Sequence, residues 1–196
     1  MKGIAPLLLA VIVVLALLGA GGAYYVLSSS GGFSDTGTTI NDIITKNVGY
    51  KCIIDLGVSY PSVGLNYEVN TAMYFHGKSL RIEVGTVVGK GIYVDPDITD
   101  ENVPIYEWTS FTGKENAIKI PKSEVGERLK DEPIFEVIYN KKNWSKPLYS
   151  LLKENLDSAL GKDIRQYEAM GVVKITKEDV KCTNWTPEKN YFEVPS

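Results

Sequence analysis

The chain has 196 residues, of which 44% are hydrophobic and 23% are charged, as is typical of a globular protein. Lysine and arginine total 21 against 24 for aspartate and glutamate, and the net charge of −3 lacks the basic excess expected of a nucleic-acid-binding protein. A single histidine, beside 12 tyrosines, argues against histidine-based catalysis or metal binding. We therefore expect a protein that is not an enzyme, carries no cofactor and binds no nucleic acid.

An uncharged apolar stretch occupies residues 4–27. As a helix it would extend over about 36 Å, which exceeds the roughly 30 Å hydrocarbon core of a bilayer. Lys2 precedes it, and because basic flanks tend to stay in the cytoplasm, the rest of the chain is expected outside. We predict a transmembrane helix acting as signal anchor over residues 1–27, a flexible linker over residues 28–38 and a β-rich extracytoplasmic domain over residues 39–196.

Two alternative interpretations of the N-terminal segment involve its cleavage. The small residues Gly21-Gly22-Ala23 follow the apolar stretch and offer a site for a signal peptidase. Lys2-Gly3, placed directly before an apolar helix, resembles the class III signal peptide of archaeal type IV pilin-like proteins. That resemblance implies cleavage after the glycine and packing of the remaining helix into a filament.

The first part of the predicted domain contains a short helix followed by strands. Residues 40–44 have helical spacing, with Thr39 as a candidate N-cap. Residues 50–58 alternate between more and less apolar side chains and are predicted to form a strand. The alternation resumes over residues 65–75 and 79–84, and the tight turn between these two segments predicts a β-hairpin.

Further strands and one long helix are predicted in the rest of the domain. The strand candidates are residues 87–94, 105–111, 117–120, 134–139, 171–175 and 180–182. The helix is predicted to begin with Ser145 as its N-cap, to hold Pro147 in its first turn and to end at Gly161. Its apolar stripe is Leu148, Leu151, Leu152, Leu156, Ala159 and Leu160. These elements predict an α+β fold in which the helix covers one face of a curved antiparallel sheet.

Two cysteines and two glycosylation sequons are consistent with a domain that is located outside the cytoplasm. Cys52 and Cys182 are expected to form a disulfide, although two buried free thiols are the alternative. Asn143-Trp144-Ser145 and Asn184-Trp185-Thr186 are glycosylation sequons, and the Pro187 that follows the second makes it a poor acceptor.

No segment carries a convincing catalytic, cofactor or metal motif. The acidic residues at 95–101 lack the glycine and the late glutamate of a calcium-binding loop and are interpreted as a solvated loop. His76 lies in a predicted hairpin turn, without a nucleophile and an orienting acid nearby in the sequence. Residues 85–91 contain glycine and lysine but not the spacing of a phosphate-binding loop.

Aromatic residues offer a candidate apolar pocket. Trp108, Trp144 and Trp185, together with the many tyrosines, are of the kind that line lipid or peptide sites on β-sheets. The alternative is that the three tryptophans only fill the core.

The end of the chain carries a family resemblance. Cys182 opens Cys-Thr-Asn-Trp-Thr-Pro, Phe192-Glu193-Val194-Pro195 follows it, and Lys78-Ser79-Leu80-Arg81-Ile82-Glu83 lies on the predicted hairpin. With Tyr50-Lys51-Cys52 on the first strand, this order resembles small membrane-anchored archaeal domains related to the outer-membrane lipoprotein carrier fold. The resemblance implies an incomplete barrel closed by one or two helices, whose concave face holds acyl chains.

The resemblance and the predicted anchor together give the expected function. We expect a membrane-anchored extracytoplasmic binding module for a lipid, an apolar ligand or a lipoprotein, attached to the membrane by a single span. The alternative is a type IV pilin-like structural subunit that assembles through its N-terminal helix.

Overall fold

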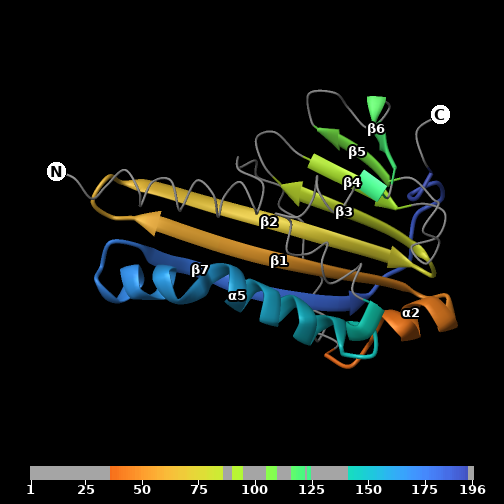
Figure 1. Ribbon diagram of the computed structural model, residues 1–196, viewed down its shortest axis with the longest axis horizontal. Coiled ribbons are helices and arrows are strands. Elements are labelled where there is room, and N and C mark those ends of the chain that lie inside the picture. Colours follow the sequence, from red (N-terminus) through yellow and green to blue (C-terminus); the bar gives the residue numbers. More distant parts are fainter. Residues whose placement is uncertain are drawn as a thin grey trace.

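The computed structural model describes residues 36–85, 90–94, 105–109, 116–121, 123–124 and 141–193. These residues form an α+β fold, in which a curved antiparallel sheet is accompanied by few helices (Figure 1). The predicted anchor over residues 1–27 lies outside the described residues, as do the strand predicted over residues 134–139 and the acidic loop over residues 95–101.

The described strands belong to one sheet in the order β6-β5-β4-β3-β2-β1-β7, and all neighbouring strands are antiparallel. Their bounds are β1 Gly49–Tyr60, β2 Leu65–His76, β3 Ser79–Gly85, β4 Lys90–Val94, β5 Ile105–Thr109, β6 Ile118–Ile120 and β7 Lys174–Asn184. The two longest strands, β1 and β2, pair along their whole length and form the central hairpin of the sheet.

The predicted β2–β3 hairpin is confirmed. His76 pairs with Ser79 across a turn formed by Gly77 and Lys78. Gly77 has a φ of 56°, a left-handed conformation that glycine adopts most easily. A Cβ atom at this position would also clash with the Oδ1 atom of Asn47, so a larger residue would have to displace the Asn47 side chain.

The short helix predicted before the sheet is also confirmed, as α2 (Ile40–Lys46). Thr39 is its N-cap: the Thr39 Oγ1 atom accepts a hydrogen bond from the Asp42 amide at 3.0 Å, and the Asp42 carboxylate accepts one from the Thr39 amide at 3.2 Å. Thr38, which the sequence assigns to the linker, already belongs to the fold, because its carbonyl accepts a hydrogen bond from the Leu148 amide at 2.9 Å.

The long helix, α5 (Leu148–Ala169), follows the short η2 turn (Lys141–Asn143) and differs from its prediction at both ends. Pro147 occupies the N-cap and no side chain caps the helix, so the prediction of a Ser145 cap was wrong. Gly161 does interrupt the helix, with φ 54° and ψ 173°, but the helix resumes after it. The non-helical angles of Gly161 kink the axis, and Ile164 and Tyr167, which follow the kink, still pack against the core.

The last two predicted strands, over residues 171–175 and 180–182, are one continuous strand, β7. Val58 pairs with Ile175 while Gly57 pairs with Lys177, so the register shifts by one residue at Thr176. This bulge breaks the alternation of apolar and polar residues that identifies a strand in a sequence. The prediction therefore divided the strand at its charged middle.

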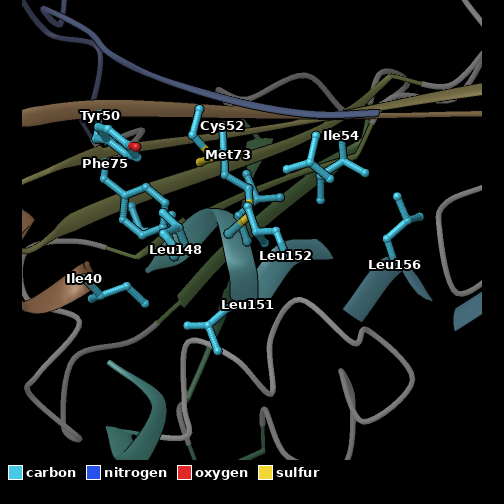
Figure 2. Packing of buried hydrophobic residues seen from close by; sticks show 14 of the residues in the cluster. Ile40, Tyr50, Cys52, Ile54, Met73, Phe75, Leu148, Leu151, Leu152 and Leu156 are labelled. Carbon is cyan, nitrogen blue, oxygen red and sulfur yellow. A yellow bond between two sulfur atoms is a disulfide. The ribbon is translucent and has the colours of Figure 1, made fainter. Parts of the chain in front are cut away.

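The hydrophobic core lies between α5 and one face of the sheet, which we call the inner face (Figures 1 and 2). The inner-facing residues of β1 and β2 that are buried are Tyr50, Cys52, Ile54, Leu56, Val58, Val69, Thr71, Met73 and Phe75. From the helix side, the predicted leucine stripe packs against them, and Leu148, Leu151, Leu152, Leu156 and Leu160 are buried. The stripe prediction is thus confirmed for its leucines, and the Ala159 side chain lies outside the described residues.

Candidate functional site

The inner face changes from covered to uncovered along β2. Phe75 and Met73 have no exposed surface and Val69 is buried, whereas Tyr67 is 39% exposed and Leu65 is 47% exposed. All five side chains point to the same face because they alternate along one strand. The apolar surface that α5 covers therefore continues to one end of the sheet, where water reaches it.

This end is the tip of the β1–β2 hairpin, and we call residues 58–67 the hairpin tip. The tip extends past β3, whose pairing with β2 ends at Asn70 opposite Gly85. It lies at the opposite end of the hairpin from α2 (Figure 1). Two further apolar side chains are exposed at this end, Val63 in the turn and Met170 at the end of α5, close to where β7 begins beside Ser59.

Tyr60 brings a polar group into this apolar surface. Its ring packs edge to face on that of Tyr67, with 6.1 Å between centroids, and also contacts the core cluster. The Tyr60 hydroxyl is buried and has no hydrogen-bond partner among the described residues. Burial, with a smaller contribution from Tyr67, raises the pKa of Tyr60 to about 12, further above physiological pH than that of an ordinary tyrosine.

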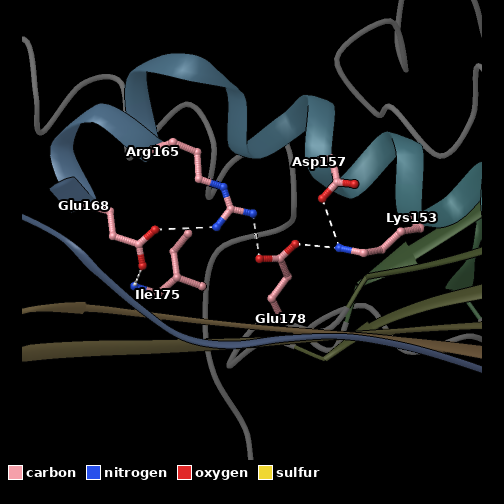
Figure 3. Close-up of polar contacts among 6 residues, drawn as sticks. All are labelled: Lys153, Asp157, Arg165, Glu168, Ile175 and Glu178. Atoms are coloured by element: carbon pink, nitrogen blue, oxygen red, sulfur yellow. Dashed lines mark hydrogen bonds and ion pairs between the residues drawn. The ribbon is translucent and has the colours of Figure 1, made fainter.

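One carboxylate on β7 holds both sections of the kinked helix (Figure 3). Glu178 accepts a hydrogen bond from the Lys153 ammonium at 2.8 Å, before Gly161, and another from the Arg165 guanidinium at 2.7 Å, after it. Burial raises the pKa of Glu178, but the hydrogen bonds from Lys153 and Arg165 outweigh burial and hold the pKa at about 2. Glu168 adds a further link by accepting a hydrogen bond from the Ile175 amide at 3.1 Å.

The opposite, outer face of the sheet carries an aromatic cluster around Arg81. The guanidinium lies 5.3 Å from the centre of the Trp108 ring and 4.4 Å from that of Tyr191, and its Nη1 donates to the Tyr191 carbonyl at 3.1 Å. Trp185 packs on Tyr74 and Tyr191, with ring centroids 5.1 and 4.9 Å apart. These contacts hold the segment after β7 against the outer face, and burial raises the pKa of Tyr191.

The three tryptophans of the predicted pocket therefore lie in two places. Trp108 and Trp185 belong to the outer cluster, while Trp144 is buried in the core beside α2, where its carbonyl accepts a hydrogen bond from the Asn41 amide. The structure does not bring them together on one surface.

The predicted disulfide is present. Cys52 on β1 and Cys182 on β7 are directly paired in the sheet, with Cα atoms 4.1 Å apart, and their sulfur atoms are bonded. Both side chains face the core and are fully buried. The bond therefore joins segments that are 130 residues apart in the sequence.

The remaining candidate residues, the two sequon asparagines and His76, lie at separate places in the fold. Asn184 is exposed at the end of β7 and Asn143 is half-buried in the η2 turn; glycosylation of either stays a prediction. His76 ends β2 and stacks on Phe192, with 6.2 Å between ring centroids. Among the described residues, no group of three or more histidine, cysteine, aspartate or glutamate side chains could hold a metal ion.

Sequence reasoning did not single out Tyr60. The sequence did contain a signal for it, because Tyr60 continues the alternation of Tyr50, Cys52, Ile54, Leu56 and Val58, but Pro61 made the end of the strand look like a turn.

In the part of the chain that the structure describes, no helix has the length and apolar character needed to cross a membrane. Searches for a matching family model, a similar curated protein or a similar solved structure found none.

Proposed function

We propose that the protein is a membrane-anchored extracytoplasmic binding module that shelters a lipid, another apolar ligand or a lipid-modified partner on the inner face of its sheet. The observation that carries this proposal is the continuity of that face, from a core closed by α5 to the exposed Leu65 and Tyr67 at the hairpin tip. An apolar chain bound at the tip would extend a surface that already excludes water.

The proposed anchor rests on the uncharged residues 4–27 and on the disulfide. Disulfides persist mainly outside the cytoplasm, which agrees with a domain that has crossed the membrane. The described chain begins at residue 36 beside α2, at the opposite end of the β1–β2 hairpin from the tip (Figure 1). Because the module is tethered, it would pass its ligand to or from a neighbour within reach instead of diffusing with it.

The resemblance to the lipoprotein carrier fold supports the choice of ligand. A curved antiparallel sheet with a helix across one face is compatible with the incomplete barrel that this resemblance implies. We propose that the module acts by binding and without catalysis.

Native mass spectrometry of the full chain, released from nanodiscs made of bacterial polar lipids, tests the proposal. We expect a fraction of the protein to retain one acyl-chain ligand after the nanodisc lipids are stripped. A matched control compares Leu65→Asp, at the exposed inner face, with Asn66→Asp, the next residue on the outer face of the same strand. Loss of the ligand only in Leu65→Asp is expected, and complete absence of a retained ligand in the unaltered chain would contradict the proposal.

The type IV pilin-like subunit remains the second proposal because Lys2-Gly3 directly precedes the apolar stretch. The intact mass of protein purified from its native membrane separates the two. A mass lacking residues 1–3 would favour a pilin-like subunit, and filaments would then be sought by electron microscopy. A full-length mass less two hydrogens is expected for the tethered binding module.

A further inference from the structure

The hairpin tip combines exposed apolar side chains with one buried donor. Leu65 and Tyr67 present apolar surface to water on the inner face, and the Tyr60 ring lies against that of Tyr67. Tyr60 pairs with Leu65 across the hairpin, so its side chain faces the same surface. The Tyr60 hydroxyl is thus placed where the covered and the exposed parts of the inner face meet.

A buried hydroxyl without a partner is unusual in a folded protein. Buried polar groups almost always find a hydrogen-bond partner, and each exception needs a reason. Among the described residues none is within hydrogen-bonding reach of the Tyr60 hydroxyl, and a phenylalanine would fill the same space without the loss of hydration. A ligand that brings an acceptor to this point would satisfy the hydroxyl.

The chemistry of the hydroxyl defines the acceptor. Because a tyrosine is protonated at physiological pH, the Tyr60 O–H is a donor, and the complementary group is a neutral or anionic oxygen. The surrounding apolar side chains favour a hydrocarbon chain next to that oxygen. A carbonyl attached to a long alkyl chain has both features, whether it belongs to a lipid ester or to a free fatty acid.

We propose that the hairpin tip is the ligand site and that the Tyr60 hydroxyl donates a hydrogen bond to the carbonyl oxygen of an acyl chain that lies against Leu65 and Tyr67, at the uncovered end of the inner face. This inference rests on the proposed function and names the polar group that positions the ligand. Val63 and Met170, exposed at the same end of the molecule, would flank the entering chain.

Photolabelling of the full chain in nanodiscs tests the inference. Three long-chain diazirine probes of equal length are compared: a methyl ester, a free acid and a hydrocarbon without oxygen. Labelled peptides are quantified by mass spectrometry, and labelling of residues 4–27 serves as the internal reference. In the unaltered chain, we expect labelling of peptides that contain residues 58–67.

Tyr60→Phe is the test variant and Tyr67→Phe is its matched control, because both remove one hydroxyl from adjacent rings. We expect Tyr60→Phe to lower labelling of the tip by the ester or the acid about three- to tenfold, as for the loss of one hydrogen bond, and to leave hydrocarbon labelling unchanged. A loss confined to the ester would assign a lipid ester as the ligand, and a loss confined to the acid would assign a fatty acid. The melting temperature of Tyr60→Phe should not fall, since the hydroxyl that this substitution removes has no partner among the described residues.

Three other outcomes overturn one proposal or both. If no probe labels the tip of the unaltered chain while residues 4–27 are labelled, the proposed function fails. If the tip is labelled equally in Tyr60→Phe with every probe, only the role of the hydroxyl fails. If Tyr60→Phe weakens labelling by the hydrocarbon as much as by the carbonyl probes, Tyr60 contributes packing alone and the inference is wrong.

Discussion

The two ends of the β1–β2 hairpin are built from the same alternating pattern but have different surroundings. Near α2, Tyr50 and Phe75 face each other on the inner face and are completely buried. At the other end, Tyr60 faces Leu65, which is half exposed. The same kind of pair, an aromatic residue opposite an apolar one, is therefore closed to water at the first end. At the second end it leaves apolar surface exposed to water.

Among substitutions that leave a folded protein, the largest expected effect comes from truncating a matched aromatic residue at each end. Phe75→Ala should lower the free energy of unfolding by about 4 kcal/mol because it opens a cavity in a closed core. Tyr67→Ala should cost less than about 1 kcal/mol because its ring is already partly in water. Urea unfolding of both variants measures the difference, and equal losses would mean that the tip is as closed as the core.

The disulfide joins β1 to β7 near the end of the hairpin that lies beside α2, since Cys52 is two residues from Tyr50. The double variant Cys52→Ala/Cys182→Ala should lower the free energy of unfolding by about 3 kcal/mol, since it releases a loop of 130 residues in the unfolded chain and removes buried sulfur atoms. The comparison is made by thermal and urea unfolding without reductant. A loss below about 1 kcal/mol would indicate that pairing of β1 with β7 does not depend on the bond.

Glu178 links the helix to the sheet on the side of the hairpin tip, and its contribution should depend on pH. Its pKa is about 2 in the folded protein and near 4.5 when unfolded, so the ionised carboxylate stabilises the fold fully above pH 4.5 and progressively less as the pH falls toward 2. We expect Glu178→Gln to cost about 1–2 kcal/mol at pH 7, after allowance for solvent screening, and clearly less at pH 3.

The free energy of unfolding of Glu178→Gln, measured at pH 7 and at pH 3, checks this prediction. Asp157→Asn is the control. Asp157 pairs with Lys153 at 3.0 Å, and its side chain is 51% exposed (Figure 3). An exposed pair of this kind is expected to contribute less than about 0.5 kcal/mol. The same loss at pH 3 as at pH 7 in Glu178→Gln would contradict the assigned pKa.

The smallest expected effect on stability is at the exposed surface itself. Leu65→Asp should change the free energy of unfolding by no more than about 0.5 kcal/mol, because the side chain is 47% exposed. The same substitution at Leu152, which is fully buried beneath α5, should prevent folding. Circular dichroism during heating distinguishes them, and a large loss in Leu65→Asp would show that the tip is part of the core.

Local signals in the sequence were sufficient for much of the fold. Thr39 with Asp42 marked the start of α2, the alternation around Gly77 marked a hairpin, and the leucine stripe marked the buried side of α5. The two cysteines were correctly paired because there were only two.

The remaining features depend on contacts between distant segments. The bulge at Thr176 hid the continuity of β7, and Gly161 looked like a helix end because the resumption of α5 depends on packing and on the pairs formed with Glu178. Trp144 and Trp185 look alike in the sequence, yet the first is in the core and the second on the outer face. Packing between distant segments determines that difference, and strand register places Tyr60 beside Tyr67.

The direct pairing of β1 with β7 has a consequence for how the protein reaches its folded state. β1 is the earliest strand and β7 the latest among the described residues, so the sheet cannot be completed until the segment around Cys182 has emerged. Such a distant pairing forms slowly, and the inner face lacks α5 and β7 until then. The β1 edge of the sheet therefore stays unpaired, and the inner face uncovered, until the last part of the chain is available. Formation of the Cys52–Cys182 bond would then report that β1 and β7 have paired.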